Sequence, residues 1–511
     1  MKATPRKPQW TDYTPAVAAG TARSSGERPQ VEITLAFWTR GMPQAKACLI
    51  APMFFGLVVT LSVCQTDSKH EVLPPGQVES VTCSADPTQS YSLYLPSTYT
   101  PAKRWPMIYL FDPGGRGRRP VELYKEIAEK YGYILAGSNN SRNFSPDPAK
   151  NVNAIWLDTH MRLALDEHRT YTSGFSGGAR VAGAMALGCA QCQIAGVIAH
   201  GAGYPNNQPK SDSKLLYFFA VGDQDFNWPE VIGIWREGEE KGLPYRVRVF
   251  PGPHQWAPAA VMEDAVEWLM LRAMQSGDLT ADATFVDRLY RQRREEAEDA
   301  ERKNDAALQL MAYRSLVSDF SRLKDVTEPE KKLALLKKSV ALKDALKNEQ
   351  EQIAEQSALE SDISPKVDAY VNGSAPDSGA LRTEILQAMG GLRDQAAHSK
   401  KEATRLVTRR ALDGLFVTWM ETGQKELESR HFEKAELCFE LMSQVKDDPW
   451  PVLLLAETHA TAGSKKLAIK DLKEAVKRGL SDPGVIESEA KFQTLRADAE
   501  FQKLVEQLKH K

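Results

Sequence analysis

The chain has 511 residues, of which 42% are hydrophobic, and its formal net charge at pH 7 is −2. This length is too great for one domain and predicts two to four. The near-neutral charge, with no basic stripe interleaved with aromatic residues, gives no electrostatic support for nucleic-acid binding.

The N-terminal part of the chain carries a targeting pattern. Residues 1–41 are rich in Pro, Ser, Thr, Arg and Lys and are predicted to be disordered. In residues 42–64, Lys46 precedes an uncharged stretch that ends at Cys64, which is typical of a signal peptide or a short membrane anchor. The end of this stretch also resembles a bacterial lipoprotein cleavage box, in which Cys64 would be acylated. We therefore expect export to the periplasm or cell surface, with the chain either released or anchored in the membrane.

Short apolar runs alternate with helical patterns between residues 77 and 275. The expected strands are residues 90–96 at a sheet edge, 107–111, 133–136, 171–175, 194–199, 215–221 and 245–250. The expected helices include residues 121–130, 152–167 and 257–274. Buried strands separated by helices predict a parallel-dominated sheet covered on both faces, with the chemistry at the carboxyl ends of the strands.

One of these strands runs directly into a serine motif, Gly174-Phe175-Ser176-Gly177-Gly178. Where a strand turns at once into a helix, the central residue takes a strained conformation and its side chain projects outward. Glycine on both sides of the serine prevents a collision across the turn. Ser176 is therefore the candidate nucleophile.

A serine hydroxyl needs an imidazole to take its proton, and the imidazole needs a carboxylate to hold its tautomer. Of the nine histidines, His254 alone lies between the last expected strand and the last expected helix. Two candidate acids follow the preceding strand, and we favour Asp225 over Asp223 because Gly222-x-x-Asp places it on the loop rather than in the turn. The order Ser176, Asp225, His254 is one that serine hydrolases use. Three other histidines are interpreted as packing or surface residues: His160, His168 and His200.

An oxyanion hole needs two backbone N–H groups that point at the developing negative charge. The residue after the nucleophile, Gly177, would supply one of them. The glycine-rich loop after residues 107–111 would supply the other, from Gly115 or, as alternatives, from Gly114 or Arg116.

The motif at 174–178, Gly222-x-x-Asp225, and His254 with Trp256 together resemble a bacterial α/β-hydrolase. The group in question is the esterases that include polyhydroxybutyrate depolymerases and feruloyl esterases, and the resemblance covers residues 77–275. It implies a serine esterase with Ser176, Asp225 and His254 as its catalytic triad. Those enzymes usually have a His-Gly pair in the oxyanion loop, where this chain has Asp112-Pro113-Gly114-Gly115.

The short interval between Ser176 and Asp225 leaves no room for a cap domain over the site. We therefore expect a shallow, open and polar site, walled by residues 116–119, 139–143 and 227–228. Substrate contacts are predicted for Arg116, Asn140 and Trp256. Such a site excludes water poorly, which suits esters of bulky alcohols better than peptide amides or lipids.

No cofactor or metal is expected. Cys189-Ala-Gln-Cys192 has the spacing of a zinc knuckle, but a zinc site needs a second pair of ligands. A disulfide, or two thiols at a helix end, is the favoured interpretation of this pair.

The composition changes after the last expected helix of the sheet. Residues 276–410 form a charged helical region, and a chain cut near residue 276 is expected to remain a folded, active hydrolase. Residues 411–511 contain a weak internal repeat close to one tetratricopeptide length, about 34 residues. The first copy has Trp419, Gly423, Ala435 and Phe439, and the second has Val452, Ala456, Ala468 and Leu472. This region is predicted to be tetratricopeptide-like and to bind a protein partner, with an unrelated helical bundle as the alternative.

The sequence therefore favours an exported serine hydrolase, specifically a carboxylesterase acting on esters of bulky or polymeric substrates such as carbohydrates. One alternative is a serine peptidase of the prolyl-oligopeptidase type. The other is a non-catalytic binding or scaffold protein that uses its helical repeats.

Overall fold

The structure is a computed structural model that describes residues 73–205, 208–210, 213–374 and 377–510. The predicted disordered segment, the predicted signal or anchor segment and Cys64 lie outside the described residues. Within the described residues, no helix is long and apolar enough to span a membrane.

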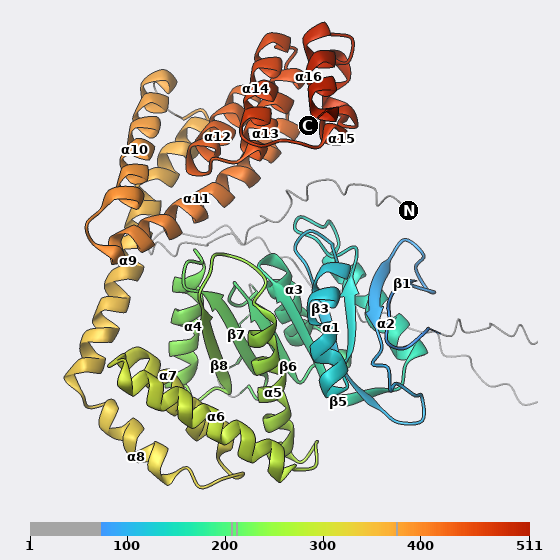
Figure 1. Ribbon diagram of the computed structural model, residues 1–511, viewed down its shortest axis with the longest axis vertical. Helices are drawn as coiled ribbons and strands as arrows, with labels where there is room; N and C mark the ends of the chain where they lie inside the picture. Colours follow the sequence, from blue (N-terminus) through green and yellow to red (C-terminus); the bar gives the residue numbers. More distant parts are fainter. Residues whose placement is uncertain (1–72, 206–207, 211–212, 375–376, 511) are drawn as a thin grey trace, which may run out of the picture. The chain divides into compact units, whose positions relative to one another are not determined.

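Eight strands form a single sheet in the order β1-β2-β4-β3-β5-β6-β7-β8 (Figure 1). The first two strands pair antiparallel to each other, β2 is also antiparallel to β4, and the remaining pairs are parallel. The strands are β1 (Val78–Thr82), β2 (Ser90–Tyr94), β3 (Trp105–Phe111), β4 (Ile134–Ser138), β5 (Leu165–Phe175), β6 (Gly196–His200), β7 (Leu216–Gly222) and β8 (Tyr245–Phe250).

Helices cover both faces of this sheet. One face packs against α1 (Arg118–Tyr131) and α5 (Ala259–Ser276), and the other packs against α2 (Pro148–Arg162), α3 (Gly177–Gly188) and α4 (Trp228–Glu240). Each face has its own core of buried apolar side chains. This arrangement confirms the predicted fold class, an α/β-hydrolase sheet followed by an all-helical region.

Two local predictions were wrong. Residues 90–96 were expected at a sheet edge, but β2 pairs with strands on both sides and β1 is the edge strand. The helix expected over 152–167 ends at Arg162, because Leu165 starts β5 by pairing with Trp105 of β3. Leu165 fitted the apolar spacing of the helix, and spacing alone does not distinguish a helix end from the first residue of a strand.

The first helices after the sheet pack against α5 and against one another. These are α6 (Ala283–Arg302), α7 (Ala306–Phe320) and α8 (Thr327–Leu336), and their apolar side chains share a core with the end of α5. Beside this core, Arg246 of β8 bonds to Asp264 of α5 at 3.1 Å and to Asp319 of α7. Arg293 of α6 also bonds to Asp264. Residue 276 is therefore not a boundary between independent packing units.

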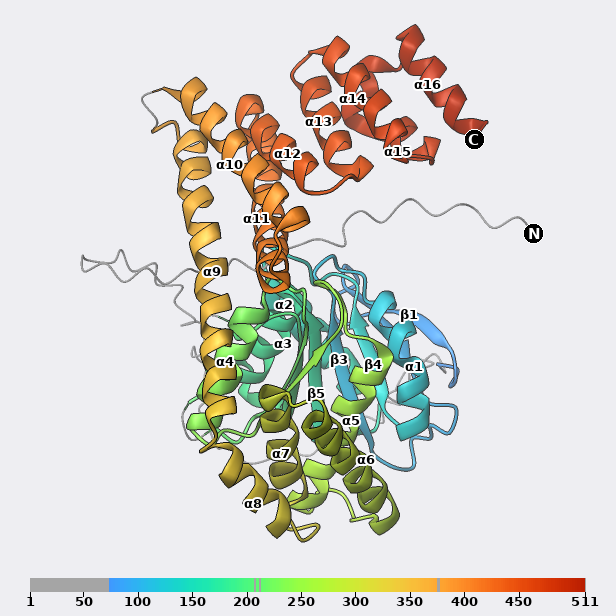
Figure 2. The ribbon, with the colours of Figure 1, turned by 60° about the vertical axis from the view of Figure 1, so that its left-hand side comes forward.

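The remaining helices form two further cores. They are α9 (Val340–Val371), α10 (Ser378–His398), α11 (Glu402–Glu428), α12 (Phe432–Val445), α13 (Pro449–Thr461), α14 (Lys465–Lys477), α15 (Pro483–Glu487) and α16 (Ala499–Lys509). The first core joins α9 to α13 and the second joins α13 to α16. Figure 2 shows α9 running past α4, to which it is joined by an ion pair between Arg236 and Glu349.

The positions of the weak repeat lie at helix contacts. All eight are buried, and a Cβ on Gly423 of α11 would collide with Phe439 of α12. Small residues are needed where helices cross this closely. Whether these helices are tetratricopeptide repeats, and whether they bind a protein partner, stay predictions.

Candidate active site

Ser176 lies at the junction between β5 and α3. Its backbone has φ 54° and ψ −122°, which is unusual for a residue other than glycine. Its N–H donates a hydrogen bond of 2.8 Å to the carbonyl oxygen of His200, at the end of β6. A Cβ on Gly174 would collide with the backbone of Gly178, and one on Gly178 would collide with the carbonyl oxygen of Phe111. The glycines of the motif are therefore required by close backbone contacts around the serine.

Asp225 and His254 form a buried pair on the loops after β7 and β8. Nδ1 of His254 lies 2.9 Å from both carboxylate oxygens of Asp225. The N–H of Asn227 donates to Oδ1 of Asp225 at 2.8 Å, which fixes the carboxylate from the other side. The second ring nitrogen of His254, Nε2, is buried and has no hydrogen-bond partner among the described residues.

The end of β6 connects this pair to the serine. His200 accepts the hydrogen bond from Ser176, and the next residue, Gly201, lies against the pair. A Cβ on Gly201 would be 2.8 Å from Oδ2 of Asp225 and 3.1 Å from Nδ1 of His254. Ser176 and the pair of Asp225 and His254 therefore both lie against the end of β6.

The imidazole of His254 packs against two aromatic rings. The ring centroid of Phe175 is 4.5 Å from that of His254, and the centroid of Phe226 is 4.4 Å away. Both phenylalanines are buried. This packing leaves the ring little freedom to rotate.

Asp223, the alternative acid, has other hydrogen-bond partners. Its Oδ1 accepts a hydrogen bond of 2.9 Å from the N–H of Gly252, and its own N–H donates to the carbonyl oxygen of Phe250. These contacts join the turns after β7 and β8. Asp225, and not Asp223, is the carboxylate at Nδ1 of His254.

The glycine-rich loop after β3 does not present open amides at Gly114 and Gly115. The N–H of Gly115 donates to the carbonyl oxygen of Asp112 at 3.0 Å, and that of Gly114 donates to its carboxylate at 2.9 Å. Asn143 occupies the space beside the other predicted donor, because a Cβ on Gly177 would collide with its carboxamide. Asn143 is held there by a hydrogen bond from its N–H to the carbonyl oxygen of Pro113 at 2.8 Å.

The three residues predicted to contact substrate have structural partners. Arg116 Nε donates to Asp112 Oδ1 at 2.8 Å, and Trp256 Nε1 donates to Asp112 Oδ2 at 3.0 Å. The carboxamide of Asn140 bonds at both ends to the backbone of residues 88–90. These contacts fix the loops around the site.

The expectation of an open site without a cover is wrong. Ser176 and Asp225 are fully buried, and 5% of His254 is exposed. Helices from beyond the predicted domain contact the loop after β7: Arg410 of α11 donates to the carbonyl oxygen of Asp223, and Gln356 of α9 donates to that of Phe226. Sequence reasoning missed these two residues. The available signal was a charged residue, Arg410, one turn after the apolar Leu406 and Val407.

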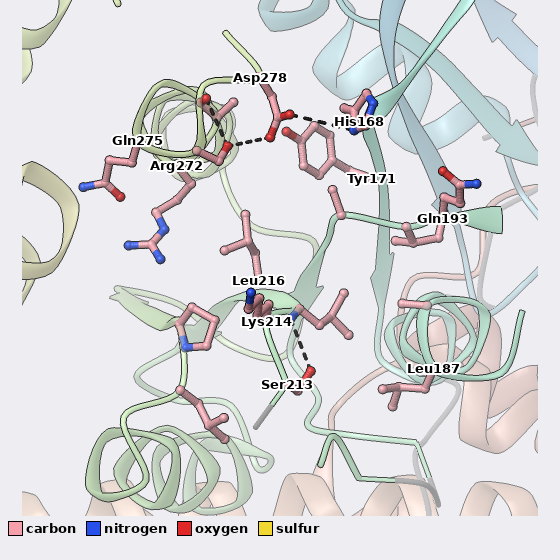
Figure 3. Close-up of a pocket in the computed structure, with 18 of the residues that line it drawn as sticks. His168, Tyr171, Leu187, Gln193, Ser213, Lys214, Leu216, Arg272, Gln275 and Asp278 are labelled. Carbon is pink, nitrogen blue, oxygen red and sulfur yellow. Dashed lines mark hydrogen bonds and ion pairs between the residues drawn. The ribbon is translucent and has the colours of Figure 1, made fainter. Parts of the chain in front are cut away.

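A cavity of about 1220 Å³ lies at the other end of the sheet, where β6, β7 and β8 begin (Figure 3). Its lining includes His168, Tyr171, Lys214 and Arg272, and none of the triad residues. Nδ1 of His168 lies 3.8 Å from Oδ1 of Asp278, another residue of this lining. The cavity is therefore separate from the candidate active site.

The paired cysteines form a disulfide between Cys189 and Cys192, at the end of α3. His200, predicted to be a packing residue, is buried with Nε2 3.1 Å from Ser173 Oγ. Burial lowers the pKa of His200 to about 3, so this ring stays neutral beneath the nucleophile.

No protein-family model matches the sequence, and no curated protein matches it. Among solved structures, S-formylglutathione hydrolase from Staphylococcus aureus is 14% identical, with a TM-score of 0.31 over 39% of this chain and 99% of its own. A ferulic acid esterase is 14% identical, with a TM-score of 0.29 over 37% and 93%. A putative dipeptidyl aminopeptidase IV from Bacteroides ovatus is 18% identical, with a TM-score of 0.30 over 37% and 35%. Likenesses at this level carry no argument about the reaction, which has to be inferred from the site.

Proposed function

We propose that the protein is a serine hydrolase that cleaves carboxylic esters, with Ser176 as nucleophile, His254 as general base and Asp225 as the acid that orients it. The observation that carries this proposal is the hydrogen bonding of the two ring nitrogens of His254. Its Nδ1 is bonded to a buried carboxylate and its Nε2 has no partner among the described residues, while the strained serine bonds to the strand end that packs against this pair. That arrangement is suited to taking a proton from a serine hydroxyl.

The reaction follows from these positions. Ser176 Oγ attacks the ester carbonyl while its proton passes to Nε2 of His254, and a tetrahedral oxyanion forms. The imidazolium, stabilised by Asp225, returns this proton to the leaving alcohol, and an acyl-serine remains. Water then attacks the acyl-serine with His254 again as the base, which releases the carboxylic acid and restores the serine.

For the oxyanion we propose two donors, the N–H of Gly177 and the carboxamide N–H of Asn143. Gly177 begins α3, and the first amides of a helix have no partner within the helix. Replacing Asn143 with Ala should lower kcat by about 10²- to 10³-fold, as the loss of one oxyanion donor does. Asn139→Ala, on the same loop, is the control and should leave kcat within about 3-fold. An Asn143→Ala enzyme with normal kcat for p-nitrophenyl acetate would assign the second donor elsewhere.

Export is part of the proposal. It rests on the charge and hydropathy pattern of residues 42–64 and on the Cys189–Cys192 disulfide, since disulfides persist mainly in oxidising compartments. Cell fractionation tests it, with recovery of the protein outside the cytoplasm as the expected result. A full-length protein found only in the cytosol would contradict export.

Assays on three substrate classes test the ester proposal: p-nitrophenyl esters of short acids, acetyl or feruloyl sugar esters, and aminoacyl p-nitroanilides. We expect turnover of esters and its loss in Ser176→Ala. The preference for bulky alcohols loses its basis, because it depended on an open site. Faster turnover of the anilides would replace the esterase with a peptidase.

A further inference from the structure

Arg410 of α11 is buried against the loop that carries Asp225. Its Nε donates a hydrogen bond of 2.7 Å to the carbonyl oxygen of Asp223, and its Nη2 donates to the same oxygen. Its guanidinium carbon lies 4.2 Å from the ring centroid of Trp228. The side chain therefore contacts both ends of the segment 223–228, and only 2% of the residue is exposed.

Two other residues of the helical region contact the middle of the same loop. Gln356 of α9 donates through Nε2 to the carbonyl oxygen of Phe226 at 2.9 Å. Gly414, one turn beyond Arg410 on α11, lies so close that a Cβ there would be 3.4 Å from Cβ of Phe226. The Phe226 ring is the one that packs on His254. The helical region thus contacts Phe226, and Phe226 in turn contacts His254.

Small movements of this loop would be transmitted directly to the catalytic acid. The carboxylate of Asp225 is oriented by the N–H of Asn227, two residues along the loop, and by Nδ1 of His254. Asn227 in turn donates through Nδ2 to the carbonyl oxygen of Gly201 at 2.7 Å. A displacement of about 1 Å in such an arrangement can cost a factor of about 10² in rate.

Packing alone does not account for an arginine at this position. Burial lowers the pKa of Arg410 to about 10, although the nearby carboxylates of Asp223 and Asp225 oppose the shift. A methionine would fill a similar volume without burying a charge. The planar guanidinium supplies two donors to one oxygen, which fixes the direction of the Asp223 carbonyl. The guanidinium also lies over the aromatic ring of Trp228.

We propose that Arg410 is a positioning residue for the catalytic acid: it holds the 223–228 loop so that Asp225 stays aligned on Nδ1 of His254. The inference rests on the proposed function, since it assigns a role within that triad. It makes the helical region a working part of the enzyme, in addition to any partner that this region binds.

The test compares Arg410→Met with Arg236→Met in the full chain. Arg236 of α4 is a close match: it donates two hydrogen bonds to Glu349 of α9, both 3.1 Å, and its guanidinium carbon lies 4.6 Å from the Trp235 ring. It therefore joins the same two regions away from the triad. kcat and KM for p-nitrophenyl acetate are measured for each protein, with the folded fraction determined separately.

Arg410→Met should lower kcat by about 10- to 100-fold with KM changed by less than about 3-fold. Arg410→Lys should recover part of the loss, because an ammonium can still donate to the Asp223 carbonyl. Arg236→Met should keep kcat within about 2-fold even if it is less stable. Normal kcat in Arg410→Met, or an equal loss in Arg236→Met, would overturn the inference.

Backbone hydrogen exchange of residues 223–228 separates this inference from the proposed function. Faster exchange in Arg410→Met, but not in Arg236→Met, supports a positioning role, and unchanged exchange overturns it. This readout needs no turnover. A wild-type protein that hydrolyses no ester would overturn the proposed function, and the exchange data would still decide whether Arg410 holds the loop.

Discussion

The helices that follow the sheet contact it in two different ways. Near β8, α6 and α7 contribute Arg293 and Asp319 to a buried cluster in which arginines face carboxylates. Near β7, α11 contributes Arg410, whose partners are a carbonyl oxygen and an aromatic ring. The first contact neutralises its charges, and the second leaves a buried charge without a directly bonded carboxylate.

This difference suggests separate roles for the two contacts. In the cluster, burial raises the pKa of Asp264, but the neighbouring Arg246, Arg248 and Arg293 outweigh it and lower the pKa to about 2. Such an arrangement stabilises one packing of α5, α6 and α7. The Arg410 contact lies at the loop that carries Asp225, which is where a positioning role would be found.

The largest expected effects are at the carboxyl ends of the strands. Ser176→Ala and His254→Ala should each lower kcat by about 10⁴-fold or more, because residues that act as one unit fail together. Asp225→Asn should also cost orders of magnitude, since it removes the carboxylate that orients His254. Asp223→Asn is the matched control, and steady-state kinetics that show it to be the more damaging change would reverse the assignment of the acid.

The buried cluster predicts a large effect on stability without an effect on rate. Asp319 bonds to Arg246 and accepts a hydrogen bond of 2.9 Å from Trp268 Nε1. Asp319→Ala should lower the free energy of unfolding by about 3–5 kcal/mol, because it leaves a buried charge incompletely paired. Urea unfolding measures this, and kcat of the folded fraction should be unchanged. A clear fall in kcat would remove the distinction between the two contacts.

A smaller effect, on the free energy of unfolding and dependent on pH, is expected at Glu360, near the Arg410 contact. Burial raises the pKa of Glu360 on α9 to about 7, although a hydrogen bond from Gln356 Nε2 at 3.0 Å opposes this. Since the folded pKa exceeds the unfolded value of about 4.3, the neutral form is favoured on folding, and stability is lost as pH rises between these two values. Glu360→Gln should therefore exceed the wild type in unfolding free energy by about 1–3 kcal/mol at pH 8 and by less at pH 5.

The control for this measurement is Glu351→Gln, an exposed position on the same helix. It should change the unfolding free energy by less than about 0.5 kcal/mol at either pH. If the unfolding free energies of Glu360→Gln and the wild type differ by the same amount at pH 5 and pH 8, the pKa of Glu360 is not raised by folding.

The local parts of the site could be predicted from the sequence. The strain at Ser176 and the pairing of Asp225 with His254 follow from glycine spacing and from the order of strand ends. The contact between Arg410 and Asp223 could not be predicted, because no periodicity records which helix face meets a loop 187 residues away. The same limit applies to the domain boundary expected near residue 276, and whether a chain cut there stays folded remains a prediction. The sequence showed only that this region is highly charged, and not that Arg293 is buried in an ion cluster.

Labelling with a fluorophosphonate probe tests the central claim most directly, because the probe reacts only with a serine whose hydroxyl has been activated. The full-length protein is treated with the probe, digested, and the modified residue is located by mass spectrometry. We expect one phosphonyl group per chain, on Ser176, and no labelling of Ser176→Ala or His254→Ala. Labelling of a different residue, or none in a folded wild-type protein, would contradict the assignment of this site as a serine hydrolase.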